Sequence, residues 1–225
     1  PYYAGLLERF GLEKYRDGYA YRVDMTAFNN DLGNLPPKVL RVVEAVRRRE
    51  KISVRGIRMS EWDNEVALAM DLINSALGHM RNHVPMDAGE FKRLAENLRS
   101  VIDPDLTLLA EVDGKPVALS ITLPDFNQAL RHANGRLFPT GWLRVLWNKR
   151  RINVASFKIL GVLEDYRARG LDSLFYIETA RVIMAKGYKW LDLSLVAENN
   201  VMMNRMARRL GGKIYKVFRT YKTAL

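Results

Sequence analysis

Apolar residues recur along the chain in two spacings, one typical of helices and one typical of strands. A spacing of three to four residues predicts amphipathic helices, and strict alternation or a short apolar run predicts strands. The expected helices cover residues 2–10, 38–50, 62–77, 88–102, 173–186 and 200–210. The expected strands cover residues 15–23, 52–59, 106–112, 117–123, 153–162, 190–196 and 214–221. This order predicts an α+β fold with a mixed, mostly antiparallel sheet and helices on both faces.

Turn residues support several of these boundaries. Asp113-Gly114 lies between two alternating segments and predicts a tight hairpin. Asp87, followed three residues later by Glu90, predicts a helix start capped by a side chain. Gly187 directly follows a helical segment, where glycine commonly ends a helix.

Two segments of the chain resemble each other at a distance of 200 positions. Residues 6–22 align with residues 206–222, and both read as a helix end, a glycine and a strand. Arg9, Gly11, Tyr15 and Tyr21 recur as Arg209, Gly211, Tyr215 and Tyr221. We interpret residues 1–24 as the C-terminal tail of a preceding copy of the domain. Residues 25–51 are then a linker with a basic helix, and residues 52–225 a complete copy with an insertion at 125–151.

The composition excludes several classes of protein. The chain of 225 residues contains no cysteine, so it has no disulfide framework, no zinc–thiolate site and no cysteine nucleophile. No apolar run approaches the roughly 18 residues that span a bilayer, and no secretory signal opens the chain. We therefore expect a cytoplasmic protein without a transmembrane segment.

Positive charge is concentrated in two regions of a chain whose net charge is +11. Residues 38–58 hold eight Lys/Arg and two Glu, and residues 202–225 hold seven Lys/Arg and no acid. Such regions attract nucleic acid, anionic membranes or a cofactor with several phosphates. A solvated helix face explains the same charge without a ligand.

One segment combines features that suit phosphate binding. Residues 159–173 (ILGVLEDYRARGLDS) read as an apolar strand, a basic turn with glycine and the start of a helix. A helix N-terminus presents unpaired N–H groups and a positive dipole end. Arg167 and Arg169 add positive charge, and Gly170 permits close approach of the backbone to a ligand.

This segment resembles the pyrophosphate signature of the GNAT superfamily of acyl-coenzyme A-dependent N-acetyltransferases. The family pattern Arg/Gln-x-x-Gly-x-Gly/Ala stands here as Arg167-Ala-Arg-Gly170-Leu-Asp172. A later family pattern, Asn-x-x-Ala-x-x-Leu-Tyr-x-x-x-Gly, stands here from Asn200 to Gly211. The resemblance covers residues 52–225 as an ordered series of elements. Residues 1–24 then resemble the end of the first copy in tandem members of the family.

The resemblance implies a site for acetyl-coenzyme A or another acyl-coenzyme A where the fourth and fifth strands part. It implies that the pantetheine arm lies along the strand and that the pyrophosphate lies on the turn. Asn200 is a candidate to order the arm or a water, and capping the helix is its alternative role. The implied cofactor-binding residues are Leu160, Gly161, Val162, Arg167, Ala168, Arg169, Gly170, Leu171, Asp172, Ser173 and Asn200.

Two departures from the family pattern weaken the catalytic part of this expectation. Asp172 replaces a Gly or Ala and brings a carboxylate to the expected phosphate site, where capping the helix is its alternative role. Ala207 replaces the Tyr that in many members protonates the leaving thiolate.

Amide formation by acyl transfer needs a base for the amine and a donor for the oxyanion. Glu164 is the preferred base among Glu164, Asp165 and Glu198, with an exposed turn carboxylate as the alternative. The N–H of Val162 is the expected oxyanion donor by its matching position. Tyr215 is a candidate acid, and packing in a strand is its alternative role.

His79 and His83 have helical metal-ligand spacing but lack a third ligand, so we expect no metal.

The insertion at 125–151 carries large apolar residues beside arginines. Trp142 and Trp147 fall on one helical face and, with Phe126, are expected to line an acceptor or long-acyl pocket. Contact of the insertion with a membrane surface is ranked below a role in lining this pocket. The alternative without a ligand is that the insertion only covers the sheet.

Two functions from different classes follow. The first is an acyl-coenzyme A-dependent N-acyltransferase, with acetyl transfer to a small-molecule or peptide amine expected. The second is a degenerate member of the family that binds acyl-coenzyme A or a nucleotide as a sensor or partner domain. Nucleic-acid binding ranks last, because no exposed aromatic residues interleave with the basic tail. The sequence does not indicate an oligomeric state.

Overall fold

A computed structural model describes residues 2–49, 52–78 and 84–223 of the chain. These residues form two compact units. The central unit comprises residues 25–191, and the terminal unit comprises the segments up to Asp24 and from Asp192 onward. Strand β6 (Trp190–Ala197) begins in the central unit and continues into the terminal unit.

The central unit is built on four antiparallel strands in the order β2, β3, β4, β5. Their bounds are β2 (Ile52–Gly56), β3 (Thr107–Val112), β4 (Lys115–Pro124) and β5 (Val154–Val162). The hairpin between β3 and β4 turns at Asp113-Gly114, as the sequence predicts, and Asp113 has the positive φ of 50° that such turns require. In register, Leu109 on β3 faces Leu119 on β4, which faces Gly161 on β5.

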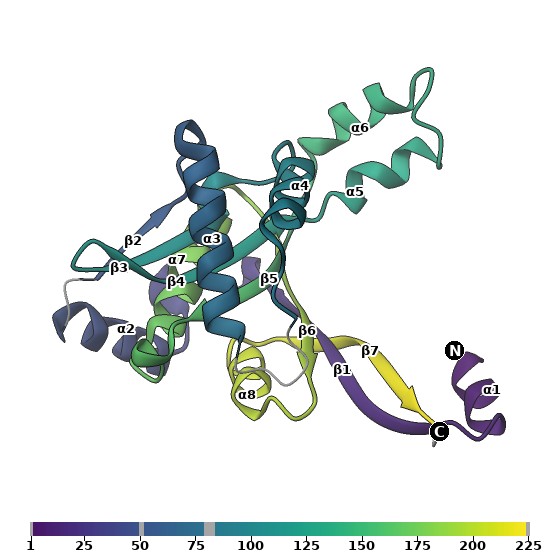
Figure 1. Ribbon diagram of the computed structural model, residues 1–225, viewed down its shortest axis with the longest axis horizontal. Helices are drawn as coiled ribbons and strands as arrows, with labels where there is room; N and C mark the ends of the chain where they lie inside the picture. The colour runs from purple at the N-terminus through teal and green to yellow at the C-terminus, as the bar shows by residue number, and fades with distance from the viewer. Residues whose placement is uncertain (1, 50–51, 79–83, 224–225) are drawn as a thin grey trace. The chain divides into compact units, whose positions relative to one another are not determined.

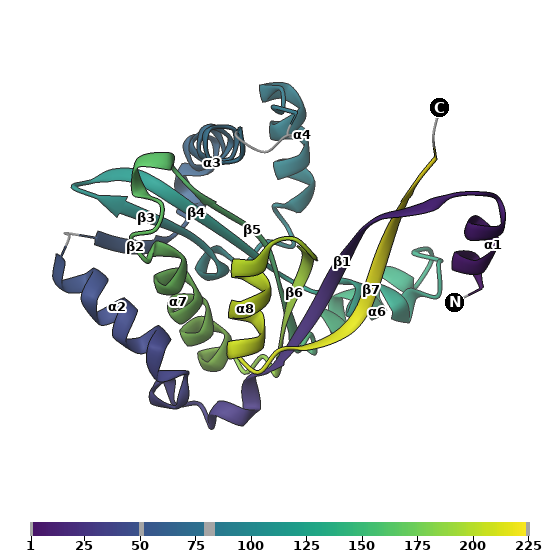
Figure 2. The ribbon, with the colours of Figure 1, turned by 90° about the horizontal axis from the view of Figure 1, so that it is seen from below.

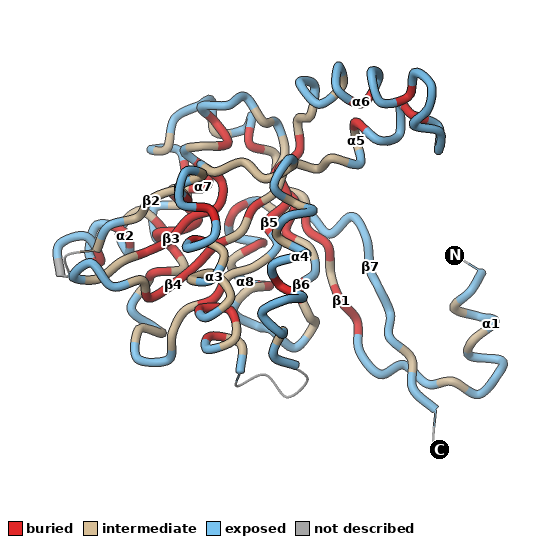
Figure 3. Tube along the Cα trace, turned by 45° about the horizontal axis from the view of Figure 1, so that its top comes forward, coloured by how far each residue is buried: buried red, intermediate tan, exposed pale blue. Residues whose placement is uncertain are grey.

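Helices cover both faces of this sheet (Figure 2). Helices α3 (Trp62–Leu77) and α4 (Ala88–Leu98) lie on one face. Helices α2 (Pro37–Arg49) and α7 (Leu171–Ala185) pack together on the other. The core under α3 joins Trp62, Leu72 and Ile73 to Leu109 and Leu119 of the strands. Figure 3 shows the buried residues concentrated along the strands and α7, as expected for a sheet sandwiched between helices.

Two further helices follow β4. Helix α5 (Asn127–Leu130) and helix α6 (Gly141–Lys149) form a hairpin that extends beyond the end of the sheet in the central unit (Figure 1). The chain then returns directly into β5 at Val154.

The terminal unit pairs the two ends of the chain. Helix α1 (Tyr3–Arg9) leads into β1 (Glu13–Asp24), and helix α8 (Val201–Arg209) leads into β7 (Lys213–Lys222). The strands β1 and β7 are antiparallel partners from Glu13 opposite Lys222 to Arg22 opposite Lys213. The two segments that resemble each other in sequence therefore share the order of helix, glycine and strand, and pair with one another.

The sequence-based boundaries hold to within a few residues in most elements. The helix expected at 62–77 has those bounds, and Asp87 caps α4 by accepting hydrogen bonds from the N–H groups of Gly89 and Glu90. The strand expected at 52–59 ends earlier, at Gly56, where a Cβ would lie 2.6 Å from the carbonyl oxygen of Pro104. The helix expected at 88–102 ends at Leu98, and the N–H groups of Val101 and Ile102 donate to the carbonyl of Leu98 in a closing turn.

Candidate functional site

The turn between β5 and α7 has the strand–turn–helix form that the sequence predicts. A short 3-10 helix (Glu164–Tyr166) follows β5, and two residues with positive φ then reverse the chain. Ala168 has φ 58° and Gly170 has φ 87°. Among the described residues other than glycine, those with positive φ are Asn or Asp apart from Ala168. Because alanine rarely adopts this conformation, its presence marks the turn as constrained by its surroundings.

Gly170 is required by packing inside the protein. A Cβ at this position would lie 2.7 Å from Cγ2 of Val46 and 2.8 Å from Cγ1 of Val42, both on α2. Helix α2 therefore packs directly against the start of α7. From the sequence we expect Gly170 to permit the close approach of a ligand, whereas in the structure it permits the close approach of α2.

Arg167 links the turn to α3 and β5. Its Nη2 donates to the carbonyl of Ala76 at 2.9 Å, and its Nε donates to the carbonyl of Val162 at 3.3 Å. Ala76 lies in the last turn of α3, whose final carbonyls lack partners within the helix. Arg169 is exposed, and its guanidinium lies over the ring of Tyr166, 4.9 Å from the ring centroid.

The N-cap residue of α7 is a glycine, so no side chain at that position caps the first turn of the helix. Gly170 occupies the N-cap position and supplies no side-chain hydrogen bond, so Asp172 is not the N-cap, contrary to the alternative drawn from the sequence. Leu171 and Ser173 are buried, and Asp172 is half-buried. Burial, with a smaller contribution from Asp172, raises the pKa of Tyr176 one turn further along the helix.

The strand residues Leu160, Gly161 and Val162 occupy the last part of β5. They pair with Ser120, Leu119 and Ala118 of β4. A Cβ on Gly161 would lie 3.1 Å from Cβ of Ala76, so this glycine lets α3 approach the strand. Glu164, the predicted base, is exposed in the 3-10 turn just beyond Val162.

Asn200 and Tyr215 lie in the terminal unit. The Oδ1 of Asn200 accepts the N–H of Met203 at 3.1 Å, so this side chain caps α8. The Tyr215 hydroxyl donates to Oδ1 of Asp192 at 3.1 Å, and Arg22 lies over its ring at 4.5 Å. Burial and the neighbouring Asp192 raise the pKa of Tyr215, which keeps the phenol protonated at neutral pH.

Glu198 and Ala207 also lie in this unit. The carboxylate of Glu198 accepts from Nζ of Lys14 at 2.7 Å and from the N–H of Asp17 at 3.0 Å. These contacts lower its pKa and make it a weak base. Ala207 is fully buried, and its carbonyl accepts the N–H of Gly212 at 2.9 Å.

The insertion residues lie at the other end of β5 from the turn. Phe126 packs against Ala129, Ala133 and Val145 within the α5–α6 hairpin. Trp142 and Trp147 are exposed by 44% and 69%. The hairpin leads into the first residue of β5, and the turn follows its last. Nine residues of strand span about 30 Å. The structure therefore does not bring these three aromatic residues to Glu164 or Arg167.

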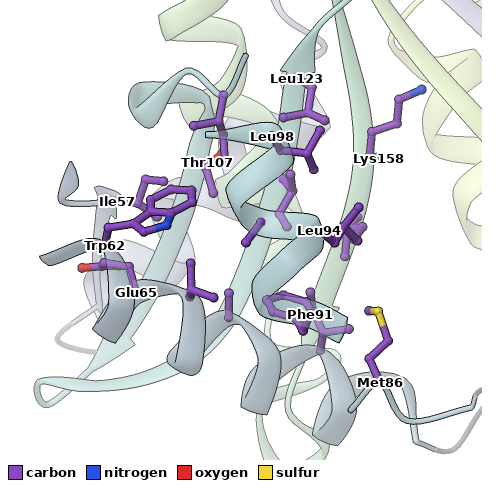
Figure 4. Close-up of a pocket in the computed structure, with 17 residues that line it drawn as sticks. Ile57, Trp62, Glu65, Met86, Phe91, Leu94, Leu98, Thr107, Leu123 and Lys158 are labelled. Carbon is purple, nitrogen blue, oxygen red and sulfur yellow. The ribbon is translucent and has the colours of Figure 1, made fainter. Parts of the chain in front are cut away.

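An apolar cavity lies between α3, α4 and the sheet (Figure 4). Its volume is about 230 Å³. Helix α3 contributes Trp62 and Ala69, helix α4 contributes Phe91, Leu94 and Ala95, and the strands contribute the opposite wall. The strand residues on that wall are Thr107, Ile121, Leu123, Lys158 and Ile159. Ile159 directly precedes Leu160–Val162, so the cavity lies beside the strand segment singled out by the sequence.

The sequence analysis missed this cavity. Its helical walls combine large apolar residues with two small ones, Ala69 and Ala95, at core-facing positions. Small residues at such positions are the available sequence signal, although periodicity alone does not show whether their neighbours fill the space.

The described part of the chain holds neither a metal-ligand cluster nor a membrane-spanning helix. No group of three His, Asp or Glu side chains that could hold a metal ion occurs there. The His79 and His83 pair considered from the sequence lies outside the described residues. None of the described helices has the length and apolar character needed to cross a membrane.

Comparison with solved structures defines the class of fold. A GCN5-related N-acetyltransferase from Sphaerobacter thermophilus superposes with a TM-score of 0.62 over 97% of this chain and 55% of that chain, at 17% identity. The chain therefore has the GNAT fold, as the resemblance of its turn and its element order predicts. No protein-family model matches the chain.

Two curated proteins resemble the chain in sequence. Bacterial ceramide synthase of Caulobacter vibrioides is 32% identical over 238 aligned residues, covering 100% of this chain and 59% of that protein. Protein YghO of Escherichia coli is 29% identical over 231 aligned residues, covering 99% of this chain and 57% of that protein. The chain thus spans somewhat over half the length of these relatives.

Proposed function

We propose that the chain is the acyl-transfer part of an N-acyltransferase that joins the acyl group of an acyl-coenzyme A to an amine carrying a long alkyl chain. The observation that carries this proposal is the constrained turn from Val162 to Ser173 in a GNAT fold, at the end of a strand that also lines an apolar cavity.

The turn supports binding of the acyl donor. The N-cap of α7 is a glycine that supplies no side-chain hydrogen bond, and a helix N-terminus favours phosphate. In the proposal the pyrophosphate lies on residues 167–173 and the pantetheine arm lies along Leu160–Val162. Arg169 is exposed at the turn and supplies charge, whereas Arg167 holds the turn to α3.

The cavity supports a long alkyl chain on one of the reactants. Its wall is almost wholly apolar, and its volume of about 230 Å³ is below the roughly 300–1,000 Å³ of typical drug-sized sites. Such a space suits a single aliphatic chain, and each buried methylene contributes about 0.8 kcal/mol. Acetyl transfer to a small polar amine would leave this cavity without a role.

The name of one relative points in the same direction. A ceramide is an amide of a fatty acid with a long-chain amino alcohol, and the relative named for its synthesis is 32% identical to this chain. We therefore propose a long-chain amino alcohol as the class of acceptor.

In the proposed reaction the amine nitrogen attacks the thioester carbonyl. Glu164 accepts, directly or through water, the proton that the ammonium form of the substrate must lose before its nitrogen can attack. The N–H of Val162 donates to the oxyanion that develops on the carbonyl oxygen. The C–N bond forms, the C–S bond breaks, and the coenzyme A thiolate leaves and takes up a proton. Tyr215 remains the predicted acid, since a tyrosine phenol is protonated at neutral pH, and Tyr215→Phe tests that role by the rate of thiol release.

Thermal denaturation tests donor binding first. Coenzyme A and palmitoyl-coenzyme A should raise the melting temperature. Arg169→Gln should reduce that rise, while Arg181→Gln removes an exposed arginine from α7, the helix that follows the turn, and should leave the rise unchanged. Equal effects of the two substitutions would contradict the assignment of the turn.

Thiol release then separates an enzyme from a binder. Release that depends on a long-chain amino alcohol supports the transferase. A rise in melting temperature without release across a panel of amines supports the second candidate, a non-catalytic acyl-coenzyme A-binding domain. Ala207 favours that candidate, because no phenol can come from this buried position.

We also propose that residues 1–24 are the tail of a preceding copy, that residues 25–51 link it to the next copy, and that this copy spans residues 52–225. The shared order of α1–β1 and α8–β7 supports this reading, as does the partial coverage of the longer relatives. Determining the structure of a full-length relative tests it, because a second GNAT-like copy should precede the segment aligned to residue 25.

A further inference from the structure

The α5–α6 hairpin (residues 126–152) has a small core of its own. Ala129 and Ala133 pack against Val145, with Phe126 and Ile152 at the margin. Gly141 lets the start of α6 approach the preceding loop closely, because a Cβ at this position would lie 1.8 Å from the carbonyl oxygen of Arg136. The hairpin thus packs internally through Ala129, Ala133 and Val145, and the leucines and tryptophans of α6 lie outside that core.

These large apolar residues face solvent. Leu143, Leu146 and Trp147 on α6 are exposed by 51%, 56% and 69%, and Phe138 at the tip is exposed by 83%. Residues 142, 143, 146 and 147 lie on one helical face. In the central unit the hairpin extends away from the sheet, so this face does not cover it (Figures 1 and 3). The exposed large apolar residues of the hairpin are Leu130, Leu137, Phe138, Trp142, Leu143, Leu146 and Trp147.

The charge of the hairpin is entirely positive. Residues 126–152 contain six Lys/Arg and no Asp or Glu. All six are exposed, and none forms an ion pair with another residue that the structure describes. They are Arg131, Arg136, Arg144, Lys149, Arg150 and Arg151.

Apolar and basic groups meet on the outer side of α6. Leu146, Trp147, Lys149 and Arg150 border an open hollow of about 650 Å³. The guanidinium of Arg151 lies 5.3 Å from the ring centroid of Trp147. Tryptophan beside arginine and leucine is the composition that lies at the boundary between lipid headgroups and acyl chains.

We propose that the α5–α6 hairpin docks the protein on the surface of an anionic lipid bilayer. The leucines, Phe138 and the tryptophans enter the upper acyl region, and the arginines contact anionic headgroups. Nucleic acid would account for the arginines and aromatic residues, but it has no partner for exposed Leu137, Leu143 and Leu146. The proposal does not depend on the proposed acyl transfer, although a surface-bound enzyme could take its alkyl substrates from the membrane.

Co-sedimentation with vesicles tests the proposal without any substrate. One set contains phosphatidylcholine alone, and the other contains phosphatidylcholine with phosphatidylglycerol at a ratio of about 7 to 3, within the range where anionic lipid attracts basic segments. The chain should bind the anionic vesicles at least tenfold more tightly, and high salt should weaken the binding.

Paired variants separate the two contributions. Leu143→Ser with Leu146→Ser should weaken binding at least tenfold through lost insertion. Arg150→Gln with Arg151→Gln should weaken it about 30-fold, taking about 1 kcal/mol for each cation near an anionic surface. Matched controls lie on α8: Val201→Ser with Met202→Ser, and Arg208→Gln with Arg209→Gln, which should change binding less than twofold. All four pairs replace exposed residues, and melting temperatures verify folding.

Tryptophan fluorescence gives an independent readout. Trp142 and Trp147 are exposed, so vesicle binding should shift the emission of the chain to the blue. The shift should disappear in the variant with Trp142→Phe and Trp147→Phe. Any of three results would overturn the proposal. The chain does not bind vesicles, the hairpin and α8 variants lose vesicle binding equally, or the chain binds an oligonucleotide with an affinity that the leucine substitutions leave unchanged.

Discussion

Arg219 on β7 donates two parallel hydrogen bonds to the carboxylate of Asp17 on β1. Its Nε donates to Oδ1 at 2.9 Å, and its Nη2 donates to Oδ2 at 3.2 Å. The two residues are direct partners in the register of the antiparallel pair. Lys14 adds a second cation 3.0 Å from Oδ2 of Asp17. This arrangement ties the two ends of the chain across 202 positions of sequence.

The Asp17–Arg219 pair predicts an acid-dependent loss of stability. The hydrogen bond from Arg219, with help from Lys14, lowers the pKa of Asp17 to about 2, whereas an unfolded aspartate titrates near 3.9. Because the folded pKa is the lower one, the stabilisation is complete above about pH 4 and is lost as the pH falls toward 2. The free energies of unfolding of the wild type and Asp17→Asn, measured in urea, should therefore differ at pH 6, and the difference should shrink as the pH falls through about 2. Asp71→Asn, at an exposed position on α3, is the control and should leave the free energy of unfolding at pH 6 nearly unchanged.

Gly170→Ala should destabilise the protein by about 1–3 kcal/mol, because the new Cβ enters the valines of α2 and the residue keeps a positive φ. Adding Val46→Ala should recover part of this cost, since it removes the atom 2.7 Å away. A double-mutant cycle measured by urea unfolding checks the coupling. Strict additivity of the two substitutions would show that α2 does not pack on the turn.

Ala95→Leu should fill part of the apolar cavity and shorten the preferred alkyl chain. The added methyl groups occupy space lined by Phe91 and Ile121. We expect the rate of acyl transfer with a 16-carbon alkyl substrate to fall at least tenfold relative to the rate with an 8-carbon one. Apolar pockets commonly discriminate between chains that differ by one to a few methylenes. Ala67→Leu places the same side chain on the exposed side of α3 and serves as the control. An unchanged chain-length profile in Ala95→Leu would place the alkyl chain elsewhere.

Arg55→Met should destabilise the protein by about 3 kcal/mol. Arg55 donates to Glu65 and to Glu111, each at 2.8 Å, and Glu65 is almost fully buried. Removing the cation leaves a buried carboxylate without a counter-charge. Adding Glu65→Met should restore much of the loss. Arg58→Met breaks an exposed ion pair with Glu61 and should cost less than about 1 kcal/mol in the same unfolding assay.

Local patterns were sufficient for the elements of the fold. The bounds of α3 follow from periodic apolar residues, and the β3–β4 hairpin follows from Asp113-Gly114 between two alternating segments. Both signals depend on residues close together in the chain. The same holds for the cap at Asp87, where the side chain binds N–H groups two and three residues later.

Contacts between distant segments were not accessible in the same way. A role for Gly170 in a close approach was predictable from the sequence. Its partners were not, because the valines of α2 that require a glycine there lie more than 120 positions earlier. The helical face with Trp142 and Trp147 was also recognised, but an amphipathic pattern does not tell whether another part of the protein covers that face. The cavity depends on how well α3, α4 and the sheet fill their shared space, which only packing determines.

The pairing of β1 with β7 has a practical consequence for any shortened version of the protein. Deleting everything before Met25 would strip β7 of hydrogen-bonding partners along Lys213–Lys222 in the terminal unit. The bare backbone edge would then be available to other molecules, a common route to aggregation. A trimmed chain should therefore begin no later than Glu13.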